Sequence, residues 1–406
     1  MEKRWFTLHA DTFIWLKSNI GIAYNSINNK KFIFQLSETI EKICHRLLKT
    51  ESLYSTELND DEVNNETVNQ WIQSMINIQS GFLSHDITYE ERPVSLKPIL
   101  KVQDKKEYYE KKHISGERGL ILQNLHELTF YINYSQFGNM AYYKQYVMPL
   151  KKCEVLDMRK ILSFIQNSRN PFLANINFVG NLFAYPAFEK FISKISDFDM
   201  PCTIHIFLHD FLENLPKIKA ISWQESIQFN ILTDAVFDVS LIKDITLPFS
   251  ITAFVFSENE FTDFSSIYEQ ISETHEMRIV PLYNGKNLSF FESNVFLDNE
   301  DLDNIDLSKN DIFMRQAFNI GDFGKLTVMP DGSVYANVNE PPLGTINDSP
   351  YSLVYKEFTE GKSWFKIRDE APCNDCVYQW LCPSPSNYER AINRPNLCKK
   401  IIMSYD

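Results

Sequence analysis

The fold of this chain is decided by residues 174–208, which run ANINFVGNLFAYPAFEKFISKISDFDMPCTIHIFL. Apolar and β-branched residues dominate its two ends, 174–179 and 203–208, and this predicts two buried strands. The segment 186–195 between them predicts a helix. A strand, a helix and a second strand in this order predict a parallel pair, because parallel neighbours need a crossover connection.

The same alternation of strand and helix continues over residues 120–296. Further strands are predicted at 128–132, 226–231, 252–256 and 277–281, and further helices at 158–167 and 264–272. Six strands in this arrangement predict an α/β fold, a partial (β/α)6 TIM-like barrel. A doubly wound open sheet is the alternative.

Composition excludes several classes of protein. The chain has 406 residues, with 40 Lys and Arg against 53 Asp and Glu, so its net charge is −13. This acidic balance argues against a nucleic acid-binding protein, which needs a basic face. An aromatic content of 14% excludes a disordered chain. Only 12 residues are glycine, which disfavours glycine-rich loops that cradle phosphates.

No targeting segment is predicted. The charged start at 1–7 is followed by no apolar core, so no signal peptide is expected. No window reaches the roughly 18 apolar residues of a membrane helix, so no membrane association is expected. We therefore expect a cytoplasmic protein, in which thiols stay reduced and clustered cysteines bind metal more often than they form disulfides.

Residues 1–88 are predicted to form a separate module. Strands are predicted at 12–16, 20–24 and 31–35, followed by amphipathic helices at 38–48 and 65–80. This order is typical of a winged-helix-like module and resembles the peptide-recognition element that binds leader peptides of ribosomally made natural products. A generic α+β accessory domain is the alternative.

Three further segments complete the predicted organisation. Residues 89–117 are charged and contain prolines, which predicts a linker. The barrel occupies 118–310, and the acidic run 298–310 at its end is expected to be a solvated connection. A cysteine-rich domain occupies 311–406.

The strongest chemical signal lies in this last domain. Cys373, Cys376, Cys382 and Cys398 have the spacing C-x2-C-x5-C-x15-C. Four thiolates this close suit either a tetrahedral zinc site or an iron–sulfur cluster. The other cysteines (Cys44, Cys153 and Cys202) are isolated, and we expect them to be inert thiols.

The C-terminal region resembles the SPASM domain of radical S-adenosylmethionine (SAM) peptide maturases. The likeness lies in 323–335 (FGKLTVMPDGSVY), in 343–346 (LGTI), in Trp364 and Arg368, and in the cysteines. Independently of the likeness, Asp331-Gly332 predicts a hairpin turn.

The resemblance implies two auxiliary [4Fe–4S] clusters. The ligands of one would be Cys373, Cys376, Cys382 and Cys398. The other would need thiolates at positions that hold Asn337 and Ser386 here, so this cluster is expected to be lost.

The resemblance also implies a SAM site, which this sequence lacks. A radical SAM enzyme carries C-x3-C-x2-C after its first barrel strand, where this chain has Ser135, Asn139 and Tyr142. Its Gly-Gly-Glu-Pro signature follows the second strand. Here those positions hold Val179, Gly180, Asn181 and Leu182. We therefore expect no SAM to bind.

Over about residues 1–400 the chain is similar to the pseudo-radical-SAM/SPASM proteins of Bacteroidales peptide-maturation systems. The stretches 382–389 (CPSPSNYE) and 394–398 (RPNLC) are especially similar. This likeness implies a pseudoenzyme without autonomous catalysis that carries one [4Fe–4S] cluster. Its expected partners are an active radical SAM maturase, in a heteromeric complex, and a precursor peptide.

Two other functions stay open. The chain is alternatively an enzyme or electron-transfer protein that uses the remaining cluster, or a structural zinc-binding adaptor. His205 and His209 are expected to be core or loop histidines and not metal ligands. The aromatic segment 133–146 is expected to fill the space left by the missing cofactor, with a surface that binds a partner as the alternative.

Overall fold

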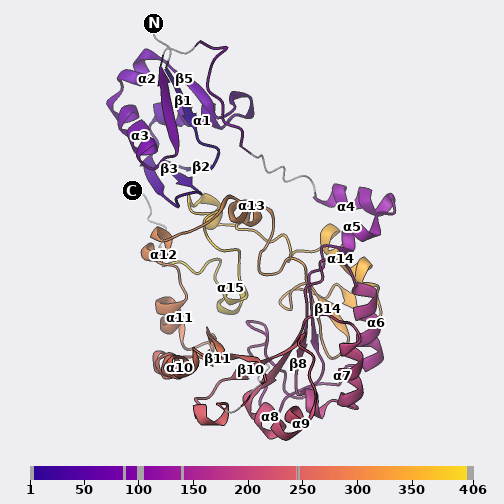
Figure 1. Cartoon of the computed structure of the whole chain (residues 1–406). Coiled ribbons are helices and arrows are strands. Elements are labelled where there is room, and N and C mark those ends of the chain that lie inside the picture. The colour runs from indigo at the N-terminus through magenta and orange to yellow at the C-terminus, as the bar shows by residue number, and fades with distance from the viewer. Residues whose placement is uncertain are drawn as a thin grey trace.

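The computed structural model describes residues 4–85, 88–97, 105–138, 141–243, 245 and 247–399. In Figure 1 the N-terminal part, coloured indigo to purple, stands above the remainder of the chain and meets it near α13 (Lys309–Ala317). The large sheet lies in the lower half, with α6 and α7 along its outer side.

A nine-stranded sheet forms the centre of the molecule. Its strand order is β12-β11-β10-β9-β8-β7-β13-β14-β15. The parallel strands are β7 (Glu127–Tyr131), β8 (Asn175–Val179), β9 (Cys202–Phe207), β10 (Ile227–Thr233), β11 (Phe249–Val255) and β12 (Glu276–Pro281). The predicted α/β fold and its six strands are therefore confirmed.

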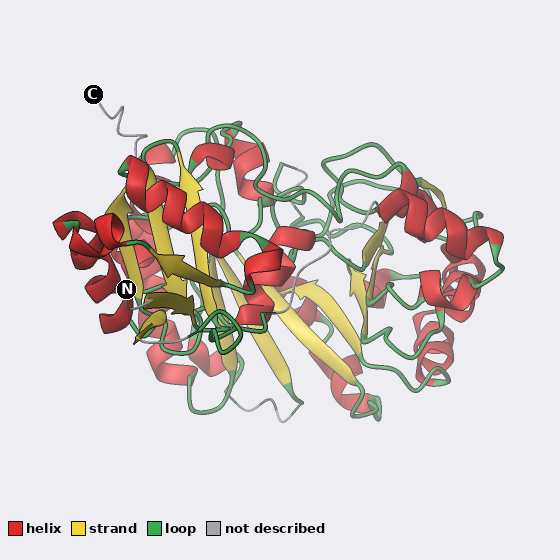
Figure 2. Ribbon diagram, turned by 90° about the horizontal axis from the view of Figure 1, so that it is seen from above, coloured by secondary structure: helices red, strands yellow, loops and turns green. Residues whose placement is uncertain are grey.

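The strands β7 to β12 lie side by side in chain order. Figure 2 shows the molecule from above, with helices (red) beside the strands of the sheet (yellow). After β12 the chain returns to the other side of β7, where β13 joins the sheet in parallel, so the strand order changes direction at β7. The partial barrel and the doubly wound open sheet both remain interpretations of this sheet. Among the described strands β12 pairs with β11 alone, so the sheet remains open at this edge.

Crossover helices pack against one face of this sheet. They are α6 (Met158–Ser168), α7 (Phe188–Ser196), α8 (Leu208–Glu213), α9 (Leu215–Ala220) and α10 (Glu258–Ile271). Alternate strand residues face them. For example, the rings of Phe178 and Phe191 are 5.3 Å apart, and both side chains are buried. No helix in the described part of the chain is long and apolar enough to cross a bilayer.

The C-terminal region extends the same sheet. β13 (Lys325–Val328) pairs in parallel with β7, and β14 (Ser333–Tyr335) and β15 (Gly344–Thr345) add antiparallel strands. The predicted Asp331-Gly332 turn is confirmed, with Gly332 at a φ of 87°. The remaining helices of this region are α11 (Leu288–Asn294), α12 (Asn299–Asp303), α14 (Pro350–Thr359) and α15 (Asn387–Ile392).

The N-terminal part contains two three-stranded sheets and three helices. One sheet holds β2 (Thr12–Lys17), β3 (Ile20–Asn25) and β4 (Lys31–Gln35), as predicted. The other sheet holds β1 (Arg4–Leu8), β5 (Ser55–Leu58) and β6 (Gly81–His85), which the sequence analysis missed.

The predicted helices of this part are α1 (Glu38–Leu48) and α3 (Glu66–Asn77), and α2 (Asp60–Asn64) was not predicted. Ser37 caps α1 by accepting a hydrogen bond from the backbone N–H of Ile40. The second helix begins one residue later than expected, because Asn65 is its capping residue.

The region predicted as a linker contains helical structure. Residues 105–114 form α4 (Lys105–Ile114), and α5 (Arg118–Leu122) follows. Both helices contact α14, where the ring of Tyr109 stacks on Phe358 with centroids 3.6 Å apart. α4 was missed because its sequence is polar on nearly all sides, so no apolar stripe marks it.

The sheet β2-β3-β4 packs directly against the C-terminal region. Buried side chains from both sides form one apolar cluster: Phe13, Ile22, Tyr24, Leu302, Leu307, Ile312, Tyr378 and Leu381. The Tyr24 hydroxyl donates to the carbonyl of Leu307 at 3.0 Å and accepts from its N–H at 2.8 Å. The expectation that 298–310 is a solvated connection holds for most of its acidic side chains, which are exposed, but Leu302 and Leu307 are buried against the N-terminal sheet.

Replacing Tyr24 with Phe is expected to lower the free energy of unfolding by about 1–3 kcal/mol. The substitution leaves both backbone groups of Leu307 buried without this partner. Urea denaturation measures the change. Tyr268→Phe is the matched control, because Tyr268 is exposed. Equal stability of the two variants would contradict the inferred role of this contact.

Candidate functional site

The four clustered cysteines surround a single cavity of about 390 Å³. Cys373 begins a short 3-10 helix, Cys373–Asp375, and the others lie in loops before and after α15. All four are free thiols and half-buried. The structure thus brings the predicted ligand set together.

The separation of the four sulfurs can be compared with that around a zinc ion. Zn–S bonds of about 2.3 Å in a tetrahedron place the sulfurs roughly 3.8 Å apart. Within the described residues, no three of these cysteine sulfurs all lie within 4.8 Å of one another. In this structure the sulfurs are therefore less closely gathered than the four ligands of one zinc ion, while still lining one cavity.

Hydrogen-bond donors surround the same cavity. Nη1 of Arg368 lies 3.7 Å from Sγ of Cys373 and 2.8 Å from a carboxylate oxygen of Glu389. Nδ2 of Asn396 lies 4.0 Å from the same sulfur. Burial raises the pKa of Cys382 to about 12, and the positive charge of Arg368 opposes this shift. Donors directed at sulfur stabilise thiolates and tune a metal centre, so the residues present fit a [4Fe–4S] cluster.

The N-terminal sheet closes one side of this cavity. Between β2 and β3, Nζ of Lys17 donates to the carbonyl of Asn374 at 2.6 Å and to Oε1 of Gln379 at 2.8 Å. Ser18 donates to the carboxylate of Asp375 at 3.1 Å. The sequence analysis missed these residues, since nothing local in 17–20 marks a binding segment.

The position predicted for a lost SAM-cluster ligand is part of a buried polar network. Ser135 donates to one carboxylate oxygen of Asp210 at 2.5 Å, and Nδ2 of Asn181 donates to the other at 3.0 Å. Nδ2 of Asn133 donates to the carbonyl of Asn181 at 2.7 Å. Burial raises the pKa of Asp210, and its two donors oppose this effect. Asp210 was not predicted, although it lies just past the end of a buried strand.

The positions predicted as a degenerate SAM-binding motif have structural roles in this chain. Val179 and Leu182 are buried. Gly180 has a φ of 137°, and a Cβ atom there would lie 2.3 Å from Oδ1 of Asn133. Only glycine allows the loop after β8 to lie this close to the loop after β7.

Aromatic residues after β7 pack over the carboxyl ends of the strands. Tyr142 and Tyr146 contact a buried cluster formed by Met148, Phe207, Leu232, Phe254 and Leu282. This packing supports the interpretation that the segment fills space at this end of the sheet, although Tyr134 and Phe137 remain exposed. Asn139 lies outside the described residues.

The positions predicted for the lost auxiliary cluster lie close together. Nδ2 of Asn337 donates to both carboxylate oxygens of Asp322, at 3.0 and 2.9 Å, and to Oδ1 of Asn387 at 2.8 Å. Ser386 occupies the position before α15, where its backbone N–H donates to Glu389, while its buried hydroxyl has no hydrogen-bond partner among the described residues. Hydrogen bonds therefore join the loop after β14 to the segment before β13 and to the start of α15.

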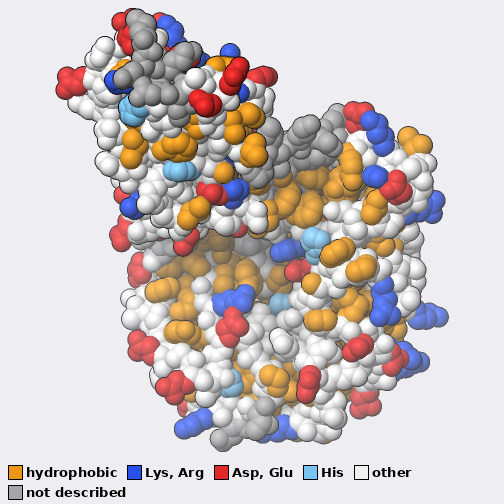
Figure 3. All heavy atoms as spheres, turned by 45° about the horizontal axis from the view of Figure 1, so that its top comes forward, with side chains coloured by type: hydrophobic (Ala, Val, Ile, Leu, Met, Phe, Trp, Pro, Cys, Tyr) orange, Lys and Arg blue, Asp and Glu red, His pale blue; other side chains and the backbone are white. Residues whose placement is uncertain are grey.

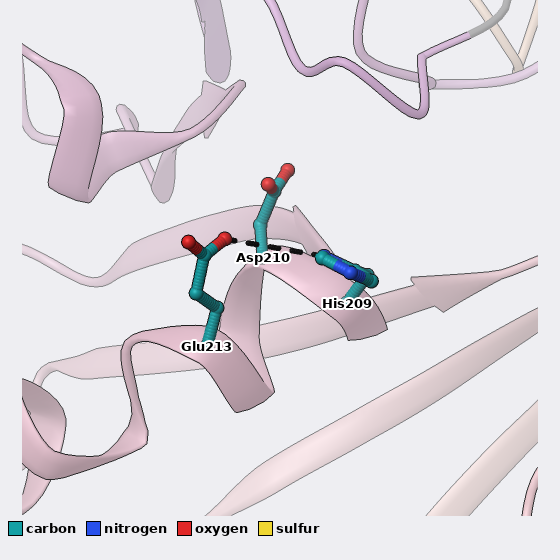
Figure 4. A group of neighbouring side chains, drawn as sticks. All are labelled: His209, Asp210 and Glu213. Carbon is teal, nitrogen blue, oxygen red and sulfur yellow. Dashed lines mark ion pairs between the residues drawn. The ribbon is translucent and has the colours of Figure 1, made fainter.

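His205 and His209 have different surroundings. His205 is buried in the sheet, where burial lowers its pKa to about 4. Figure 4 shows His209 and Glu213 joined by an ion pair of 4.0 Å on α8, with the Asp210 carboxylate above them. The Asp210 carboxylate already accepts from Ser135 and Asn181, and the His209 ring lies 4.0 Å from the ring of Phe137. A metal role for this group stays unsupported.

Replacing Asp210 with Ala is expected to lower the free energy of unfolding by about 1–3 kcal/mol, because Ser135 and Asn181 lose their shared acceptor. Glu213→Ala on the same helix is the control, with an expected change within about 0.5 kcal/mol. Denaturant unfolding measures both. A stable Asp210→Ala variant would show that the network does not hold these loops.

No family model matches the chain, and no curated protein matches it. Two solved structures of SuiB from Streptococcus suis are similar, one bound to the precursor peptide SuiA and one bound to S-adenosylmethionine. Each is 11% identical and covers 97% of this chain. The peptide complex is covered over 98% of its own chain with a TM-score of 0.43, and the other over 99% with a TM-score of 0.42. Both likenesses are distant, with 11% sequence identity and TM-scores below 0.5.

Proposed function

We propose that this chain is a non-catalytic partner in peptide maturation that carries one [4Fe–4S] cluster. The observation that carries the proposal is a contrast between the cysteine cavity and the two positions, around Ser135 and Asn337, where the resemblance would place further clusters. The four cysteines line an open cavity. The positions of the two missing clusters instead hold side chains that hydrogen-bond to their neighbours, through Ser135 and Asn337.

The cluster is assigned to Cys373, Cys376, Cys382 and Cys398. Bound by four thiolates, it supplies one-electron transfer and has no open coordination position for a substrate. Arg368 balances the negative charge of this site while it pairs with Glu389. The cluster then serves to hold the C-terminal loops together or to pass electrons to a partner.

We propose that this chain does not bind SAM. A hydroxyl, an amide and a phenol stand where thiolates would be needed, and two of these side chains have other roles. Ser135 donates to Asp210, and Tyr142 packs near Phe256, with ring centroids 5.2 Å apart. An active maturase in a heteromeric complex would have to supply the chemistry.

A precursor peptide is proposed to bind beside β4. This strand lies at the edge of the sheet β2-β3-β4, and Ile33 on it is exposed. An extended peptide binds such an edge through backbone hydrogen bonds, while side-chain contacts provide specificity. Because the same sheet covers the cysteine cavity, peptide and cluster would lie on one structural unit.

Metal analysis after anaerobic purification tests the cluster. We expect about four irons and four sulfides per chain, and their loss in Cys382→Ser. Cys153→Ser is the matched control and should retain both. Zinc without iron would favour the structural adaptor instead. SAM cleavage by the purified, reconstituted chain alone would overturn the non-catalytic assignment.

Peptide binding is tested by fluorescence anisotropy with the precursor peptide encoded beside this chain, and by co-purification with its maturase. Ile33→Glu is expected to weaken peptide affinity at least about tenfold, because it places a charge at the proposed contact. Ile27→Glu is the control, since Ile27 is also exposed but lies outside β4. Equal affinity of the two variants would exclude this edge as the binding site.

A further inference from the structure

A second cavity, of about 470 Å³, lies on the face of the large sheet opposite the crossover helices. Its wall is formed by side chains from five adjacent strands, β8 to β12. Residues two apart contribute from the same strand, as Gln228 and Asn230 do on β10. This spacing places them on one face. Nearly all of these side chains are polar, which is unusual for a parallel sheet.

The floor of the cavity is a continuous hydrogen-bonded belt. Nε2 of His205 lies 3.0 Å from Oδ1 of Asn177, and Nδ1 of His205 lies 3.0 Å from Nδ2 of Asn230. The hydroxyl of Thr252 donates to Oδ1 of Asn230 at 3.0 Å. All four side chains are buried. The belt holds its members in fixed orientations, and burial keeps the imidazole neutral by lowering its pKa to about 4.

The walls offer hydrogen-bonding groups and no excess charge. Gln228 is exposed, and its side chain has no hydrogen-bond partner in the described part of the chain. Arg278 pairs with Glu276 at 2.7 Å, so their charges cancel. Tyr146 contributes an aromatic ring at one side.

This cavity is separate from the positions that correspond to a SAM site. Those positions, Ser135 and Asn181, follow the carboxyl ends of β7 and β8. The cavity residues occupy the amino-terminal and middle positions of their strands, and apolar side chains such as Phe207 and Leu232 lie further along the same face.

The chemistry of the lining excludes several ligands. An anion would need an unpaired cation, and a metal ion would need converging ligands, which the described lining residues do not form. Peptides bind along sheet edges or in apolar or aromatic grooves, and this wall is a polar sheet face that spans the strands β8 to β12. The volume lies within the roughly 300–1,000 Å³ of small-molecule sites.

We infer that this cavity binds a small, uncharged molecule rich in hydroxyl groups, of the size of a monosaccharide or disaccharide. Amide and hydroxyl side chains both donate and accept, as sugar hydroxyls do. Tyr146, whose ring packs on Phe254, lines the cavity at the end of this polar face. This inference is independent of the cysteine site.

Isothermal titration calorimetry of the full chain with D-glucose, maltose and myo-inositol tests the inference. We expect saturable binding of at least one of them with a Kd of about 1 mM or tighter. Gln228→Leu is expected to weaken it at least about tenfold. Because Gln228 is exposed and outside the belt, its replacement leaves the fold intact. Gln166→Leu, an exposed position on α6, is the matched control and should bind as the unaltered chain does.

Titrations with inorganic phosphate and N-acetylglycinamide complete the experiment. Absence of saturable binding by all three hydroxyl-rich probes at about 20 mM would overturn the inference. Binding of phosphate or of the amide in their place would overturn it as well. Unchanged binding in Gln228→Leu would show that the molecule binds elsewhere.

Discussion

The parallel pairing of β7 to β12 in chain order is the constraint on which the rest of the structure depends. Each crossover between neighbouring parallel strands has the same hand, so the connecting helices collect on one face. The opposite face is left without helices and is free to be lined by loops and polar side chains. Both the polar cavity and the aromatic packing after β7 exist because of this asymmetry.

Buried polar groups then decide how the loops beside the sheet are held together. A polar side chain removed from water is costly unless it finds a partner. Ser135 and Asn181 share Asp210, and Asn337 bridges Asp322 and Asn387. These networks join loops that lie far apart in the sequence. At the cysteine cavity, Arg368 and Asn396 instead direct donors at the sulfur of Cys373.

Much of the fold followed from local patterns in the sequence. Runs such as 203–208 contain enough apolar and β-branched residues to mark a buried strand, and the structure has β9 at Cys202–Phe207. β1 was hidden by the charged residues beside it, and α4 by its lack of an apolar stripe. Both elements are stabilised by contacts with distant segments, which a local pattern does not record.

The candidate site could be predicted only in part, because many of its contacts also join segments that are distant in the sequence. The four cysteines fall within a short stretch, and their spacing marks them as one set. Asp210 meets Ser135 across 75 residues, and Lys17 meets Asn374 across 357. Such pairs depend on tertiary packing, and single residues of common types give no local signal. The polar belt of the sheet was missed because each of its members lies on a different strand.

The cysteine cavity is lined by residues from both ends of the chain, Lys17 to Ile20 and Ala371 to Cys398. During synthesis the first of these leaves the ribosome about 380 residues before the last. At about 5–20 residues per second, that interval is roughly 20–75 s. The apolar face of the N-terminal sheet therefore stays uncovered until the segment up to Leu381 has been synthesised. Closure of the cavity cannot precede the synthesis of Cys398.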